Sequence, residues 1–560
     1  MDGTATLFVN GQIFLSPSGI KPGAGGQNAG LQHRAPTFAE CMLVRNNTIE
    51  FVGARSNAPA AAAQAKVVDL QGKTVLPGFV DGHMHLMLLG QSLTKIDLGK
   101  CKSLDDIRAT ISAYASENPD VPRILCRGWM HSMTPGGVTA SALDDVDSQN
   151  RPILIDSKDL HSTWCNTAAL RELAAESWKD VAGGTIERDA DGKLKGLFTE
   201  AANMTYVWPW LASVASMQAR IAAIRAAIDA YHSCGYTGMI DMAMDEGAWE
   251  AVQAMRAEGE VPMRIAAYWL IRPGDDTLAQ VDRAIELSKQ HNQSTTPDCR
   301  IIGIKVICDG IIDACTAALS EPYAAADSDG HVGLPLWTEG ELVPVVKRAT
   351  EGNLQVALHA IGDAAVKMAI DVISAHVPAN LRPRIEHLEL TNEEDVARLG
   401  EKGIVASIQP VHADPAILGA WPKLLGEHRR KRAFAYREFA DAGAPLALGS
   451  DSPTAPHEPL ANIYVGTTRR SYRRPEMSKE DAVNPHFALG LCEAVVAATE
   501  GAAWSCCADG SIGRLHDGLS ADFVVVDMEW DNVKLLEARV LETWYDGKKV
   551  WPAAVGGMSR

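Results

Sequence analysis

Eight β-rich segments, separated by segments with helical periodicity, constrain the fold of this 560-residue chain more than any other feature. Such alternation is typical of a parallel sheet covered by helices, because each parallel connection has to cross back over the sheet. Eight is the number of strands that closes a (β/α)8 TIM barrel. We therefore predict an α/β fold with such a barrel as its main body. The predicted strands are 78–85, 235–243, 264–271, 301–310, 354–363, 384–390, 404–412 and 444–453.

The interval between the first and second predicted strands is far longer than one crossover needs. Loops without structure of their own seldom exceed ~15 residues, so we predict an inserted subdomain at about residues 90–215. At the two ends of the chain the sequence returns to short β-rich runs with turn residues, such as Asn10-Gly11 and Asp546-Gly547. These two remote β segments are predicted to share one small sheet.

Side chains of metal-ligand type lie at the ends of predicted strands one, four, five, six and eight. In a parallel barrel the carboxyl ends of the strands meet at one face, where active sites lie. His83 and His85 are two positions apart on one strand and point to the same side. Neutral imidazoles and carboxylates suit zinc and its first-row neighbours. The joint pattern predicts a metal site made of His83, His85, Lys305, His359, His387 and Asp451.

Each of these residues also has a purely structural interpretation. A single histidine in an apolar strand, such as His359, is commonly a hydrogen-bonded core residue, and Asp451 could belong to a turn or a cap. Lys305 lies in the apolar run IIGIKVIC, where an unpaired ammonium is costly or loses its proton. Either a salt bridge to Asp309 or Asp313 keeps this lysine charged, or its uncharged amine reacts with carbon dioxide to form a carbamate that can bridge two cations.

Five motifs at these positions resemble the amidohydrolase superfamily of metal-dependent hydrolases, and specifically its amidohydrolase-3 branch of YtcJ-like proteins and N-substituted formamide deformylases. The motifs are LPGFVDGHMH, IKVICDG, LHAIGD, RIEHLEL and LGSDSP. The resemblance extends over nearly the whole chain. It implies a small β-sandwich built from both termini, at residues 1–76 and 513–560, and a metal-dependent hydrolase barrel with its insertion at residues 77–512.

The resemblance also implies how the ligands are shared between two metal ions. The more buried ion would bind His83, His85 and Asp451; the second would bind His359 and His387, with a carboxylated Lys305 bridging both. Four neutral histidines and one carboxylate leave two divalent ions with excess positive charge, which supports a bridging anion. With an unmodified lysine, one ion is the more natural number. We expect zinc, although iron, manganese or cobalt fit the same ligands.

These inferences predict a hydrolase that cleaves a non-peptide carbon–nitrogen bond in a small molecule, such as an amide, an N-substituted formamide or an N-acyl group. A metal-bound hydroxide would attack the carbonyl, and Asp451 would pass the proton of the water to the departing nitrogen. The same site could instead hydrolyse an ester or lactone, or decarboxylate its substrate. A non-catalytic relative of the fold is disfavoured, because all six ligands are present.

Three further residues are candidate substrate contacts. Trp129 and His161 lie in the predicted insertion, and His412 follows the seventh strand. Loops at the carboxyl ends of barrel strands form the substrate pocket, which makes these side chains candidates for its walls. Packing is the alternative role for Trp129 and His412.

Composition limits the partners of the chain. Its 52 Lys and Arg against 70 Asp and Glu give a net charge of −18, which repels phosphate backbones and anionic lipid surfaces. The sequence contains no run of about 18 apolar residues and therefore predicts no membrane span. Its eleven scattered cysteines have no CxxC spacing and do not indicate a disulfide framework. We expect a cytoplasmic enzyme that binds a small-molecule substrate and neither nucleic acid nor membrane; the resemblance is compatible with a homodimer.

Overall fold

The computed structural model describes residues 5–17, 35–158, 162–181, 184–200, 202–259, 261–324 and 330–553. The chain divides into two compact units. The larger unit comprises Met1–Leu86, Ile228–Asp245 and Glu260–Arg560, and the smaller unit comprises Met87–Ala227 and Glu246–Gly259.

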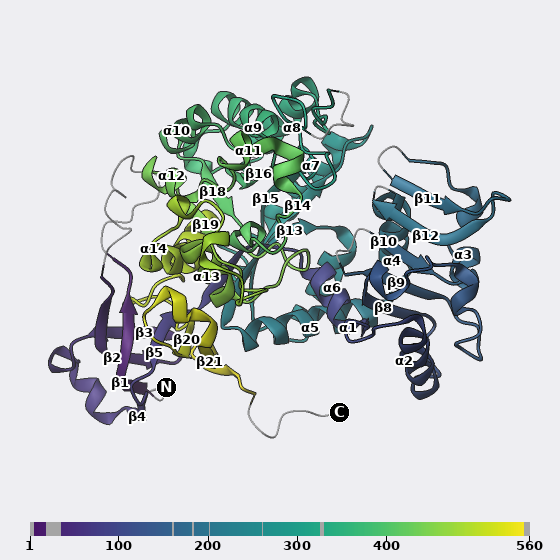
Figure 1. Ribbon diagram of the computed structural model, residues 1–560. Coiled ribbons are helices and arrows are strands. Elements are labelled where there is room, and N and C mark those ends of the chain that lie inside the picture. Colours follow the sequence, from purple (N-terminus) through teal and green to yellow (C-terminus); the bar gives the residue numbers. More distant parts are fainter. Residues whose placement is uncertain are drawn as a thin grey trace. The chain divides into compact units, whose positions relative to one another are not determined.

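Eight parallel strands form the barrel sheet of the larger unit (Figure 1). In spatial order they are β6 Phe79–Met84, β13 Tyr236–Met244, β14 Arg264–Ile271, β15 Cys299–Ile307, β16 Gln355–Ala360, β17 Arg384–His387, β18 Val405–Ile408 and β19 Leu446–Leu448. Each strand pairs with the next barrel strand along the chain, and each overlaps one of the eight predicted segments. The prediction of a TIM-like α/β fold is therefore confirmed.

The barrel is nearly closed between its first and last strands. Just beyond β19, the backbone N–H of Asp451 donates to the carbonyl of His83 at 2.7 Å. Glycines permit this close approach: a Cβ on Gly82 would lie 2.5 Å from the carbonyl oxygen of Leu448, and one on Gly449 would lie 2.4 Å from the His83 nitrogen. This seam, where β6 meets the end of β19, brings together two predicted ligand positions that are remote in the sequence.

Helices connect the later barrel strands. Helix α8 begins with a capping box, in which Thr338 accepts a hydrogen bond from the Glu341 N–H and the Glu341 carboxylate accepts one from the Thr338 N–H, so its start is fixed by local sequence. In chain order the helices are α7 Thr277–Gln290, α8 Glu339–Glu351, α9 Asp363–His376, α10 Glu393–Lys402, α11 Trp421–Arg430, α12 Tyr436–Asp441, α13 Pro459–Thr468, α14 Leu491–Val496 and α15 Ala502–Ser505.

A second sheet of the larger unit joins strands from both ends of the chain, purple and yellow in Figure 1. Strands β20 and β5 pair antiparallel, with Phe523 opposite Pro77. The rings of Phe8 and Phe523 pack edge to face at 5.1 Å between centroids, so aromatic packing holds the two ends together. The strands are β1 Ala5–Leu15, β2 Thr37–Arg45, β3 Thr48–Gly53, β4 Lys66–Asp69, β5 Thr74–Pro77, β20 Phe523–Asp527, β21 Arg539–Tyr545 and β22 Lys548–Trp551.

The smaller unit contains its own six-stranded mixed sheet and its own core. The strands are β7 Ile96–Asp97, β8 Ile124–Trp129, β9 Ile153–Ser157, β10 Ser162–Cys165, β11 Gly184–Arg188 and β12 Leu194–Glu200. Ile107 and Ile111 of α2 (Leu104–Glu117) are buried in the same cluster as Trp164. The other helices that lie wholly or partly in this unit are α1 Leu86–Thr94, α3 Thr167–Glu172, α4 Trp208–Val214, α5 Met217–Ser233 and α6 Glu246–Ala257.

No single helix among the described residues has both the length and the apolar character needed to cross a membrane. One pair of consecutive helices, Thr205–Val214 and Met217–Ser233, meets these criteria jointly, with a bend of 105° at the break between them.

Candidate metal centre

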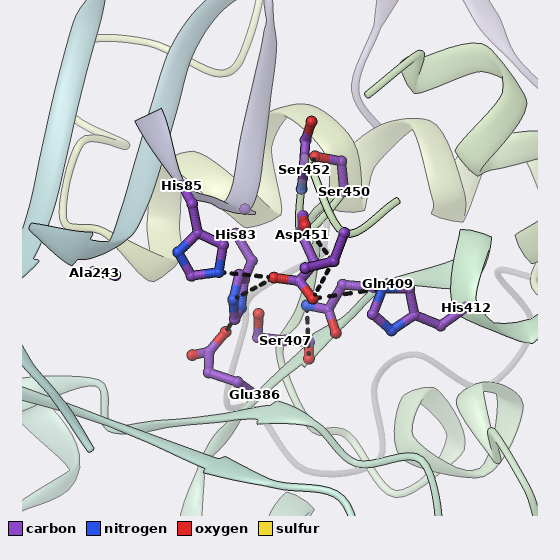
Figure 2. Close-up of polar contacts among 12 residues, drawn as sticks. His83, His85, Ala243, Glu386, Ser407, Gln409, His412, Ser450, Asp451 and Ser452 are labelled. Atoms are coloured by element: carbon purple, nitrogen blue, oxygen red, sulfur yellow. Dashed lines mark hydrogen bonds and ion pairs between the residues drawn. The ribbon is translucent and has the colours of Figure 1, made fainter. Parts of the chain in front are cut away.

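Asp451 connects His83 of β6 with His85, which follows the end of that strand, across the seam of the barrel. Its Oδ1 lies 3.0 Å from His85 Nε2 and 3.2 Å from His83 Nε2 (Figure 2). One ligand-type atom from each of the three side chains lies within 4.8 Å of the other two. The HxH pair of the first strand and the aspartate after the eighth thus form one compact group, the spacing that a single ion requires.

The histidines of β16 and β17 lie beside this group. The ring centroid of His387 is 4.9 Å from that of His83 and 4.3 Å from that of His359. His387 adopts a φ of +79°, unusual for a residue with a Cβ, and this conformation is found at sites where surrounding structure imposes it. His387 also forms a second compact group of ligand-type atoms with Glu389 and His412.

Four imidazole nitrogens in this cluster are buried and make no hydrogen bond to any described residue. They are His83 Nε2, His85 Nδ1, His359 Nε2 and His387 Nδ1. Two of them lie at ion-pair distance from a carboxylate: His83 Nε2 is 3.2 Å from Asp451 Oδ1, and His359 Nε2 is 3.6 Å from Asp309 Oδ1. Burial lowers the pKa of His359 to about 3 and that of His387 well below its ordinary value, with nearby cationic groups adding to the effect. The His359 and His387 rings therefore stay neutral, the form in which imidazole binds a metal ion. The donor set fits a divalent ion.

Asp451 supplies the negative charge of the cluster. Burial raises its pKa, but the neighbouring histidines outweigh this effect and hold the pKa well below its ordinary value. Its Oδ1 faces the HxH pair, whereas its Oδ2 accepts a hydrogen bond from Thr454 Oγ1 at 2.7 Å and lies 3.5 Å from His412 Nε2. The two oxygens of one carboxylate therefore serve two different sets of partners.

Lys305 is buried on β15 and forms no ion pair within the described part of the chain. Asp309, one proposed salt-bridge partner, instead accepts three backbone hydrogen bonds, from Ala318, Ile361 and Gly362. The other, Asp313, accepts from the indole N–H of a tryptophan at 3.2 Å. Burial lowers the pKa of Lys305 to about 8, so an uncharged amine is accessible near neutral pH. The two aspartates therefore contact other groups, and no salt bridge to Lys305 is formed among the described residues.

Sequence reasoning missed the residues that orient the ligands. Glu386 Oε2 lies 2.7 Å from His83 Nδ1, and the same carboxylate accepts two hydrogen bonds from Arg384, at 2.5 and 3.1 Å. Such a partner fixes the ring and leaves Nε2 directed at the metal position. An Arg and a Glu two positions apart on a buried strand are a signal for a buried ion pair. The signal does not reveal that His83 completes it.

Sequence reasoning also missed Glu389, because the sequence does not reveal that its carboxylate meets His412. Its Oε1 lies 3.0 Å from Nδ1 of His412, so the second ring nitrogen of His412 points towards Asp451. Glu389 is buried, and its burial raises its pKa while the contact with His412 opposes that rise. A second imidazole held by a carboxylate therefore lies next to the predicted ligands.

The candidate substrate contacts have different locations. His412 lies in a short 3-10 helix, Pro410–Ala413, after β18 and beside the ligand cluster (Figure 2). Trp129 is fully buried in the core of the smaller unit, where its indole N–H donates to Thr134 Oγ1 at 3.1 Å, an arrangement typical of a packing residue. His161 lies outside the described residues.

Sequence comparisons identify relatives of the whole chain. The model of the Amidohydrolase family matches residues 66–551. The chain is 29% identical to Protein LONG AFTER FAR-RED 3 of Arabidopsis thaliana, over 98% of this chain and 91% of that protein. It is 27% identical to the putative amidohydrolase YtcJ of Bacillus subtilis, over 87% and 90% of the two chains. It is 25% identical to the N-substituted formamide deformylase of Arthrobacter pascens, over 91% and 94%.

A solved structure has the same fold. An uncharacterized metal-dependent hydrolase from Pyrococcus furiosus superimposes with a TM-score of 0.76 at 25% identity, covering 95% of this chain and all of that one.

Proposed function

Because the chain belongs to the amidohydrolase family, it is a hydrolase, and we propose that it cleaves a non-peptide carbon–nitrogen bond of a small molecule. One observation carries this proposal: Asp451 lies 3.0 and 3.2 Å from the two histidines of the HxH pair, in a cluster where other buried imidazole nitrogens, such as His85 Nδ1 and His387 Nδ1, make no hydrogen bond to the described chain. The similarity to an N-substituted formamide deformylase supports amides of this type as the first substrates to test.

Two sets of residues are proposed to hold divalent ions. His83, His85 and Asp451 would bind one ion, and His359 with His387 would bind the second. We further propose that Lys305 is carboxylated and bridges the two, since its burial favours the uncharged amine that reacts with carbon dioxide. Zinc is the proposed metal because imidazole and carboxylate ligands suit it. When bound, such ions polarise a substrate carbonyl and lower the pKa of water.

The side chains of the site have separate tasks in this proposal. Asp451 remains ionised, because the histidines lower its pKa, and it can accept a proton and pass it to the departing nitrogen. Glu386 holds His83 through Nδ1, so that its Nε2 stays directed at the site. His412, held by Glu389, is placed to contact the substrate next to Asp451.

The first test is the metal content of the protein, purified without chelators in the presence of bicarbonate and measured by elemental mass spectrometry. We expect about two equivalents of a first-row metal, falling in Lys305→Ala. One equivalent that is insensitive to Lys305 would replace the bridged pair by a single ion. No metal after reconstitution would overturn the proposed hydrolytic site and favour a binding protein.

The second test is a substrate panel of N-formyl, N-acyl, cyclic-amide and aryl-ester compounds. We expect N-substituted amides to be the best substrates of the panel. Rapid ester or lactone hydrolysis with negligible amide turnover, or decarboxylation of a carboxylated analogue, would assign different chemistry to the same residues. Asp451→Asn is the matched control, because it changes one atom of the site and leaves the packing volume almost unchanged.

A further inference from the structure

A small group of exposed apolar side chains lies at the carboxyl end of β15. Ile307, the last residue of the strand, is 37% exposed, and Leu334 and Leu336 in the following loop are 74% and 57% exposed. Single exposed apolar residues are common on protein surfaces. Here, however, three of them belong to one strand end and its loop, and we call this group the apolar lip.

The side chain of Ile307 faces the same side of the sheet as two predicted metal ligands. It lies two positions after Lys305 on β15, and alternate residues of a strand point to the same side. It also pairs in register with His359 of the parallel strand β16, and paired residues of neighbouring strands share a face. These two relations place Ile307 on the face that carries the candidate metal centre, at the exposed end of the strand.

Leu336 is held next to this position by the backbone. Its N–H donates to the carbonyl of Cys308 at 2.7 Å, and Cys308 directly follows Ile307. The Cys308 N–H in turn donates to the carbonyl of His359 at 3.0 Å, so the loop, the strand end and the ligand strand are tied together. The apolar lip is therefore joined by backbone hydrogen bonds to the strand that carries His359, one of the predicted metal ligands.

We infer that the apolar lip binds an apolar substituent of the substrate, so that the preferred substrates are amides carrying an alkyl or aryl group rather than small polar amides. This inference rests on the proposed function and adds the substrate class to it. An apolar group placed on the lip removes the exposed surface of Ile307 and Leu336 from water, which makes binding stronger with each added methylene. Polar amides of the same size gain nothing from this contact.

The test uses the zinc-loaded 560-residue protein and straight-chain N-alkylformamides from N-methyl to N-hexyl. We expect kcat/KM to rise roughly fourfold per methylene until the lip is covered, mainly through a lower KM. The slope should flatten in Ile307→Ser and in Leu336→Ser. Leu278→Ser is the matched control, because Leu278 is 47% exposed on α7, outside the lip, and its slope should equal that of the unaltered protein.

A binding measurement separates failure of this inference from failure of the proposed function. If no member of the series is hydrolysed, the proposed function fails, and calorimetric binding of the same compounds to the metal-free protein still tests the lip. Affinity that rises with chain length and is lost in Ile307→Ser supports the inference. A rate and an affinity independent of chain length, or a slope equally steep in both lip variants, overturns it.

Discussion

The two compact units both bury charged and polar side chains, but in different ways. In the smaller unit, Arg151 donates to both carboxylate oxygens of Asp147, at 2.9 and 3.0 Å, and to three backbone carbonyls. In the candidate metal centre of the larger unit, four buried imidazole nitrogens make no hydrogen bond to the described chain. Buried polar groups satisfied within the chain indicate structural roles, whereas those left without a partner indicate a binding site.

The largest expected effect comes from a substitution in the candidate metal centre of the larger unit. Asp451→Asn should lower kcat by about 10²–10⁴-fold, because it removes the group proposed to transfer the proton. Metal content should fall much less, since both histidines remain. Steady-state kinetics with elemental analysis of the same sample measures both. Asp527→Asn, at an exposed site 54% accessible, is the control and should retain full turnover; an unchanged kcat in Asp451→Asn would contradict the proposed role.

The second prediction concerns the buried, fully hydrogen-bonded pair of Arg151 and Asp147 in the smaller unit. Arg151→Ala should lower the free energy of unfolding by about 3 kcal/mol, because it leaves the buried Asp147 carboxylate without its partner. Urea titration followed by circular dichroism measures the change. Arg283→Ala removes an exposed pair with Glu286 and should cost less than about 0.5 kcal/mol. Equal losses in the two variants would remove the distinction drawn between buried and exposed pairs.

A smaller effect concerns the orientation of one ligand. Glu386→Gln should weaken metal binding by about 10–100-fold, because the amide supports the His83 ring less well than the carboxylate does. Competition with a chelator of known affinity measures the metal dissociation constant. Glu389→Gln is the matched variant at His412, outside the proposed ligand set, and should leave that constant nearly unchanged. Similar losses in both variants would indicate that His412 is itself a ligand.

The smallest effect is a pH dependence in the smaller unit. The hydrogen bonds from Arg151 lower the pKa of Asp147 to about 2, below the ordinary value of about 3.9 in an unfolded chain. The pair therefore stabilises the fold above pH ~4, and this contribution, about 1–2 kcal/mol, is lost as the pH falls towards 2. Thermal unfolding between pH 2 and pH 5 measures it. The same pH dependence in Asp147→Asn would assign the effect to other groups.

The parts of the fold that depend on periodicity could be predicted from the sequence. Strands such as β15 and β16 are long apolar runs between helical segments, and the grouping of the predicted ligands at their ends follows from the geometry of a parallel barrel. The residues that support the ligands could not be predicted. Glu386 and His387 are sequence neighbours that alternation would place on opposite faces, yet both contact His83, because His387 has left the strand conformation.

The sequence also could not decide whether Trp129 lines a pocket or packs in a core. A tryptophan between a glycine and a loop is compatible with either a pocket wall or a core, since its sequence surroundings are similar in both cases. Its burial depends on Trp164 and on the strands of a sheet that pairs segments remote in sequence. Only tertiary packing decides between the two roles.

The seam of the barrel has a consequence for the synthesis of the protein. His85 and Asp451 are 366 positions apart, and they meet only where the first strand adjoins the end of the last. A ribosome-bound chain that has not yet exposed residue 451 cannot assemble this group, however well its early strands have formed. The complete ligand group proposed at this position therefore forms only when the barrel is complete, and a product terminated before residue 451 lacks the carboxylate that joins the two histidines.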